Sequence, residues 1–139
     1  MTIEKLQKKD LDDAIALVAT LVPRELSIEQ AYQVYDQIKD DDNYALLAAK
    51  EGDELLGTVT AIVCGALTSP FLVLEDFVVK PGRTGQGIGG MLLDAADRFA
   101  VAHHCTYAIL VSSGFRKDAH RFYENHGFTE DVRGFRKGY

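Results

Sequence analysis

The spacing of hydrophobic and polar positions predicts alternating strands and helices along the whole chain. Apolar residues that recur every three or four positions, as from Leu11 to Val22, mark helices with one buried face. Short apolar runs bounded by turn residues, as from Phe71 to Val79, mark strands. In chain order the predicted elements are strand 2–7, helix 11–22, helix 28–39, strands 44–49, 55–64 and 71–79, helix 88–102, strand 106–112, helix 117–126 and strand 128–135.

The connections between these elements indicate how the strands pair. Asp10 and Ser27 stand where helix N-caps are expected, and Gln30 is placed to complete a capping box with Ser27. The turn at residues 51–54 joins two strands as an antiparallel hairpin, whereas the later strand–helix–strand units favour a parallel pair. We therefore expect an α/β fold, a mixed sheet covered by helices, in a single domain that spans residues 1–139.

Composition and charge narrow the class of protein. The chain has 139 residues and a net charge of -6, whereas nucleic-acid-binding proteins usually carry a basic face. It holds no run of about 18 apolar residues and no apolar segment after its charged N-terminus, so we expect a cytoplasmic protein without a membrane span. Cys64 and Cys105 lie far apart and lack metal-ligand spacing, which predicts neither a metal site nor a disulfide framework.

A glycine-rich segment lies between the strand at 71–79 and the helix at 88–102. Glycines let the backbone approach a ligand closely, and a helix N-terminus presents N–H groups to phosphate oxygens. Residues 85–90 also satisfy the G-x-G-x-x-G pattern of dinucleotide-binding proteins. That interpretation is disfavoured, because the glycines begin about five residues after the strand and no acidic residue ends the strand at 106–112. A phosphate-binding loop is favoured over a plain strand–helix connection.

Two segments resemble the sequence motifs of one enzyme family. Residues 73–81, with the loop Thr84-Gly85-Gln86-Gly87-Ile88-Gly89, are similar to the signature of the GCN5-related N-acetyltransferases, whose phosphate loop reads Gln/Arg-x-x-Gly-x-Gly/Ala. Residues 119–128 resemble the family's Ala-x-x-Phe-Tyr-x-x-x-Gly-Phe motif. The order of predicted elements agrees over nearly the whole chain. The resemblance implies the acyl-CoA N-acyltransferase fold of this family, with acetyl-CoA as the acyl donor.

The resemblance also implies which residues bind the acyl donor. The pantetheine arm would enter a cleft where the strand at 71–79 splays from the strand at 106–112, and would pair with main-chain groups there. Thr84 replaces the family's usual Gln or Arg, with Arg83 one place earlier, and Arg116 stands where many relatives carry Asn. The implied cofactor-binding residues are Phe77, Val78, Val79, Arg83, Thr84, Gly85, Gln86, Gly87, Ile88, Gly89, Gly90 and Arg116.

An amine must lose a proton before it attacks a thioester, so the reaction needs a base. Glu75 is the candidate, because it stands in an apolar strand where desolvation raises a carboxyl pKa. In a regular strand Asp76 points to the opposite face, although a bulge would reorder the two, and pairing with a neighbouring base is the structural alternative for both. The amide of Val79, freed by the splay, would donate to the oxyanion. Tyr123 is the family-matched acid for the leaving thiolate, since a phenol pKa of about 10 exceeds a thiol pKa of about 8.5.

The acceptor site is the least defined part of this interpretation. In the resembling family the helix at 28–39 borders it, so Tyr32 and Tyr35 are candidate substrate contacts with Asp76, and core packing is the alternative for both tyrosines. The leading hypothesis is acetyl transfer from acetyl-CoA to a primary amine of a small molecule. Segments resemble both aminoalkylphosphonate and polyamine acetyltransferases, which require opposite pocket charges.

Two other functions remain open for the same fold. They are a peptide or protein lysine acetyltransferase and a catalytically silent acyl-CoA-binding module. A homodimer is a family-based expectation, and neither a nucleic-acid nor a membrane partner is expected.

Overall fold

A five-stranded sheet forms the centre of the N-terminal part of the chain. The computed structural model describes residues 1–22, 24–112 and 117–139, and the chain divides into two compact units, Met1–Ile109 and Leu110–Tyr139. The first unit contains β1 (Thr2–Lys5), β2 (Tyr44–Glu51), β3 (Glu54–Gly65), β4 (Pro70–Val79) and β5 (Ala108–Ile109). Neighbours from β1 to β4 pair antiparallel and β5 pairs parallel with β4. The predicted mixed sheet is therefore confirmed, while the single-domain assignment stays a prediction.

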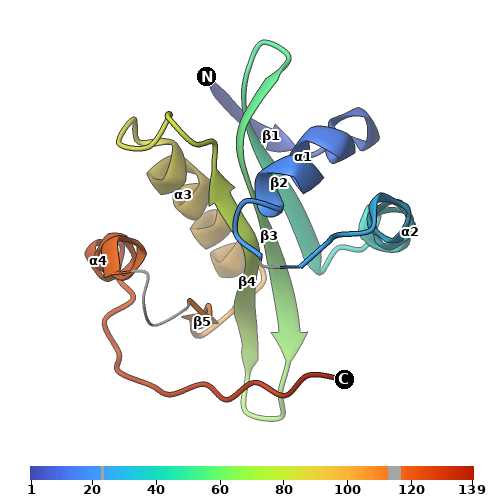
Figure 1. The fold of residues 1–139 in the computed structure, drawn as a ribbon. Coiled ribbons are helices and arrows are strands. Elements are labelled where there is room, and N and C mark those ends of the chain that lie inside the picture. Colours follow the sequence, from blue (N-terminus) through green and yellow to red (C-terminus); the bar gives the residue numbers. More distant parts are fainter. Residues whose placement is uncertain (23, 113–116) are drawn as a thin grey trace. The chain divides into compact units, whose positions relative to one another are not determined.

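Helices cover both faces of this sheet (Figure 1). On one face lie α1 (Leu11–Val18), which follows the 3-10 turn η1 (Lys8–Asp10), and α2 (Ile28–Ile38). On the other face lies α3 (Ile88–Ala102). The first face buries a cluster that includes Leu11, Tyr35 and Val78. On the second, Ile88 and Leu92 lie 3.3 and 3.2 Å from the place where a Gly57 side chain would begin, so α3 packs directly on β3.

Side-chain hydrogen bonds fix the starts of the first two helices in different ways. Ser27 caps α2 as predicted, because its hydroxyl oxygen accepts from the Gln30 N–H at 3.1 Å. Asp10 stands at the N-cap of α1 as predicted, but its side chain makes no capping hydrogen bond there. Its carboxylate accepts instead from the Gln7 N–H at 3.1 Å and from the Lys50 ammonium at 2.9 Å. Lys50 is only 3% exposed, so this buried ion pair ties the start of α1 to β2.

A bulge interrupts β4. Glu75 lies opposite Thr60 and Val78 lies opposite Thr58, so Asp76 and Phe77 share the single opposing position between them. Asp76 has a φ of 52°, in the left-handed region. The extra residue reverses the alternation of side chains, and Val78 consequently joins the core beneath α1.

The C-terminal unit contains one described helix, α4 (Lys117–Asn125). The strand predicted at 128–135 is wrong, because residues 128–139 form neither helix nor strand. A strand needs a neighbour for its N–H and C=O groups, and the described residues of this unit provide none. Three further elements are at least two residues shorter than predicted: β1 ends at Lys5, α1 ends at Val18 and β5 has two residues. No described helix is long and apolar enough to cross a membrane.

Candidate active site

Within residues 1–109, the edge of β4 that faces β5 is open beyond Val73. β5 pairs with β4 only at Leu72 and Val73, so within residues 1–109 the remainder of β4 has no strand partner on that side. Lys80 donates its N–H to the Leu56 carbonyl of β3 at 2.7 Å. Because successive residues direct their N–H groups to opposite edges of a strand, the N–H of Val79 points to the open edge. The splay expected between β4 and the residues that follow β5 stays a prediction.

The loop between β4 and α3 has a backbone suited to an anion. Gly85 and Gly87 have φ values of 79° and 80°, which glycine adopts without strain. Gly87 is the N-cap of α3, so the N–H groups that follow it have no acceptor within the helix. The first turn reads Ile-Gly-Gly-Met and is uncharged, and its helix dipole therefore acts on a bound anion without opposition. Residues 84–90 fit the diphosphate of coenzyme A. Within this range only Ile88 and Gly89 are buried.

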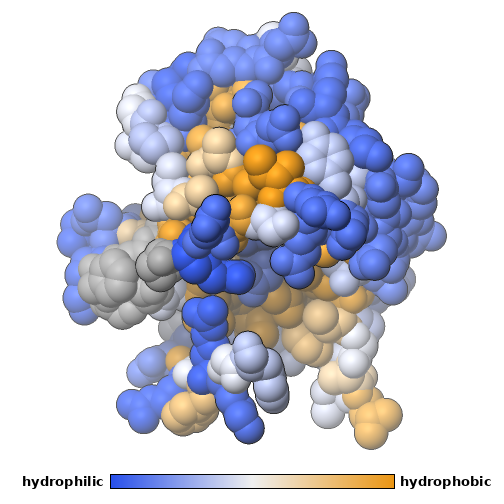
Figure 2. All heavy atoms as spheres, turned by 45° about the vertical axis from the view of Figure 1, so that its right-hand side comes forward, coloured by the Kyte–Doolittle hydropathy of each residue, from blue (hydrophilic) through white to orange (hydrophobic). Residues whose placement is uncertain are grey.

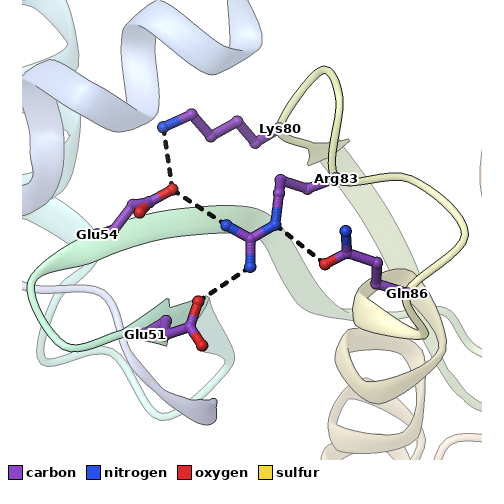
Figure 3. Close-up of polar contacts among 5 residues, drawn as sticks. All are labelled: Glu51, Glu54, Lys80, Arg83 and Gln86. Carbon is purple, nitrogen blue, oxygen red and sulfur yellow. Dashed lines mark hydrogen bonds and ion pairs between the residues drawn. The ribbon is translucent and has the colours of Figure 1, made fainter.

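Arg83 is fastened to the β2–β3 hairpin (Figure 3). Its guanidinium lies 2.9 Å from a Glu51 oxygen and 3.4 Å from a Glu54 oxygen, and its Nε donates to the Gln86 side chain at 3.0 Å. Lys80 pairs with the same Glu54 oxygen at 3.2 Å. The guanidinium lowers the pKa of Glu51 through a hydrogen bond and its charge. The side chain of this predicted cofactor-binding residue is thus directed at the hairpin, where it holds the loop.

A pocket of about 600 Å³ lies between α1, α2 and the sheet. Tyr35, Glu75 and Asp76 all line it. The expectation for a regular strand, in which Asp76 faces away from Glu75, is therefore wrong, and the bulged alternative holds. Figure 2 shows hydrophobic surface in the middle of this side of the molecule, bordered by hydrophilic side chains.

Burial affects the carboxyl group of Asp76. Glu75 and Asp76 are both exposed overall, yet burial of the Asp76 carboxyl raises its pKa, opposed by the positive charge of Arg24. Desolvation therefore acts on the Asp76 carboxyl, and the desolvation expected at Glu75 stays a prediction. A carboxylate with a raised pKa is closer to the range in which it exchanges protons at neutral pH.

The two predicted tyrosines of α2 have separate surroundings. Tyr35 is buried, lines the pocket and donates its hydroxyl to the Leu6 carbonyl at 3.4 Å. Tyr32 is not among the residues that line this pocket. It donates to the Asp12 carboxylate at 3.0 Å, and that hydrogen bond raises the pKa of Tyr32. Tyr32 thus links α2 to α1.

Several pocket residues were missed by the reasoning from sequence. Thr60 and Ile62 of β3 line the wall beside Glu75, and Tyr44 of β2 lines it as well. The sequence did carry a signal for β3: polar threonines stand at alternate positions, Thr58 and Thr60, of an otherwise apolar strand. Arg24 and Glu25 come from the link between α1 and α2, and such a link carries no periodic signal.

Tyr123 belongs to the C-terminal unit. It is buried on α4, and its ring centroid lies 5.6 Å from that of Phe122 and 6.0 Å from that of Phe128. Its role as an acid stays a prediction. Arg116, the other predicted site residue of this segment, lies outside the described residues.

Comparison with known proteins identifies the same family that the glycine-rich loop and the 119–128 segment resemble. The acetyltransferase (GNAT) family matches residues 11–128. Uncharacterized N-acetyltransferase YhdJ of Bacillus subtilis (strain 168) is 34% identical over 120 residues, 81% of each chain. Aminoalkylphosphonate N-acetyltransferase of Salmonella typhimurium is 27% identical over 93% of this chain and 85% of its own. The crystal structure of a transcriptional regulator from Bacillus halodurans C-125 superposes with a TM-score of 0.91 at 26% identity over 99% of both chains.

The family assignment follows directly. The chain belongs to the GNAT acetyltransferase family and is an acetyl-CoA-dependent N-acetyltransferase.

Proposed function

We propose that this enzyme transfers the acetyl group of acetyl-CoA to a primary amine of a small molecule. The observation that carries the proposal is the β4 bulge, which brings Glu75 and Asp76 onto the wall of one pocket. The volume of about 600 Å³ falls in the range of small-molecule sites. A lysine on a folded protein would instead need an open groove. The small-molecule acceptor is therefore favoured over a protein substrate.

The acyl donor is assigned to the open edge and the helix start. The main-chain N–H groups of residues 84–90 would hold the diphosphate, and Phe77, Val78 and Val79 would flank the pantetheine arm. Arg83 acts on this site indirectly, since its guanidinium is paired with the hairpin. When bound, acetyl-CoA supplies an activated acyl carbon.

We assign one role to each reacting side chain. Glu75 takes a proton from the ammonium group, and the neutral nitrogen then attacks the thioester carbon. The Val79 N–H, which points to the open edge, donates to the oxygen that becomes negative. The carbon–sulfur bond breaks, and the Tyr123 hydroxyl gives its proton to the departing sulfur. The nitrogen, now bonded to the acyl carbon, loses its second proton, which restores the Tyr123 hydroxyl. Asp76 and Tyr35 contact the acceptor.

The base assignment is tested by Glu75→Gln. We expect kcat at neutral pH to fall by about 100-fold or more, because general base catalysis contributes at least that much. The loss should narrow as pH rises, since the free amine then needs less help. Rates are followed by thiol release from acetyl-CoA, and coenzyme A affinity by calorimetry should stay at the wild-type level.

Two comparison variants sharpen this test. Glu29→Gln, an exposed change on α2 outside the pocket lining, should behave as wild type. Asp76→Asn shows whether the neighbouring carboxylate is the base instead. A Glu75→Gln rate equal to wild type at every pH would refute the assignment. Coenzyme A binding without thiol release from any amine would support a silent binding module.

A further inference from the structure

The lining of the acceptor pocket is predominantly apolar. Aliphatic and aromatic side chains come from two helices and two strands around it, among them Ile15 and Val18 of α1, Val34 and Ile38 of α2, Tyr44 of β2 and Ile62 of β3. Neutral polar side chains are the minority, namely Ser27, Gln30, Thr58 and Thr60, and Ser27 and Thr58 already form hydrogen bonds within the protein. Such walls offer a polyhydroxylated acceptor fewer hydrogen bonds than apolar contacts. They favour burial of an apolar body.

Charge in the pocket is concentrated and negative. Of the described lining residues, Glu25, Glu75 and Asp76 carry carboxyl groups, and Arg24 carries the one positive charge. The positive charge of Arg24 acts on the Asp76 carboxyl, and the three carboxyl groups outnumber this one guanidinium. An anionic acceptor would meet a net negative pocket, whereas a cationic head would be attracted to it.

The positions of the carboxylates also limit how many cationic groups an acceptor can place in the pocket. Beyond Glu75 and Asp76, the described walls that α1, α2 and β2 contribute carry no carboxylate. A polyamine would find a third carboxylate only at the exposed Glu25, on the link between α1 and α2. Elsewhere its second ammonium would lie against aliphatic side chains, which is costly.

We propose, on the basis of the function proposed above, that the acceptor is a primary monoamine with an apolar aryl or alkyl body. Its ammonium lies at Glu75 and Asp76, and its body lies against the apolar walls. This excludes aminoalkylphosphonates, polyamines and aminosugars as preferred acceptors.

The first test compares acceptors with the wild-type enzyme. The panel is 2-phenylethylamine, hexylamine, 2-aminoethylphosphonate, spermidine and an aminosugar, each measured by thiol release from acetyl-CoA. We expect kcat/KM for the two apolar monoamines to exceed the others by about tenfold or more, because each buried methylene is worth about fourfold. A preference for any of the other three would overturn the inference.

The second test uses two exposed β-branched residues of α2. Val34 is 43% exposed and lines the pocket, whereas Ile28 is 50% exposed and does not. Val34→Asn should raise KM for 2-phenylethylamine by about three- to tenfold, and Ile28→Asn should leave it unchanged. Equal effects of the two variants would contradict the inference.

Binding separates this inference from the proposed function. Calorimetry of 2-phenylethylamine and 2-aminoethylphosphonate with coenzyme A-loaded protein needs no turnover. Tighter binding of 2-phenylethylamine without any thiol release would uphold the pocket inference and refute the acetyl-transfer proposal. Equal or weaker binding of 2-phenylethylamine would refute the pocket inference, whatever the turnover.

Discussion

Asp76 combines a left-handed backbone with a partly buried charge. Its φ is 52°, and burial raises its carboxyl pKa while Arg24 opposes that rise. Asparagine tolerates the same backbone conformation, so Asp76→Asn removes the charge and keeps the bulge. The pKa of Asp76 is higher in the folded state than in the unfolded state. The free energy of unfolding therefore falls as pH rises between these two pKa values, and above both of them the full destabilisation by the charged carboxylate applies.

We therefore expect Asp76→Asn to stabilise the protein at neutral pH. The gain should be below about 1 kcal/mol, because solvent still screens the group. It should vanish once pH falls below the unfolded pKa of about 3.9, where both states are protonated. Calorimetric unfolding at neutral and acidic pH measures it. Asp42→Asn, in the exposed loop after α2, is the control and should change little. Stabilisation of Asp76→Asn that persists at acidic pH would contradict the electrostatic explanation.

At the scale of elements, local chemistry was readable from sequence wherever the signal lay within a few residues. Ser27 before an apolar stripe predicted the start of α2, and the turn at residues 51–54 predicted the hairpin between β2 and β3. Asp10 carried the same signal as Ser27. Its carboxylate instead pairs with Lys50, 40 residues away, and that partner is not visible in a local pattern.

The site was predictable in part for the same reason. The glycine spacing predicted a helix start with left-handed turns, and Gly85 and Gly87 have them. The bulge was not fixed by sequence, because an acidic pair within an apolar strand is equally compatible with regular alternation. It depends on the register against β3, where Thr60 meets Glu75.

The pairing of Arg83 with Glu51 and Glu54 couples the phosphate loop to the hairpin. Arg83→Ala should weaken coenzyme A binding by about two- to tenfold, because exposed ion pairs contribute up to about 1 kcal/mol each. Calorimetry measures the affinity, and Arg98→Ala on the exposed face of α3 is the control.

A double variant decides whether Arg83 positions the loop or contacts phosphate. Glu51→Gln with Glu54→Gln frees the guanidinium and keeps its charge. If the ion pairs position the loop, the double variant should also bind coenzyme A more weakly. Equal or tighter binding would mean that Arg83 contacts the ligand directly.

At the scale of the whole chain, the family match spans residues 11–128 and so includes parts of both compact units. Ligand binding to the folded state alone stabilises it, by about 2.7 kcal/mol at a ligand concentration of 100 times Kd. If main-chain N–H groups at the start of α3 bind the diphosphate, ADP should share much of this effect, and adenosine and pantetheine should show little. Thermal unfolding at equal ligand excess measures the stabilisation by each ligand.

The proposed diphosphate site consists of main-chain N–H groups, so its geometry depends on the backbone at Gly87. Gly87→Ala should therefore reduce the stabilisation by ADP, because alanine disfavours the φ of 80° at the N-cap. A pantetheine shift as large as that of coenzyme A, with none from ADP, would place the binding energy on the β4 edge instead of the helix start.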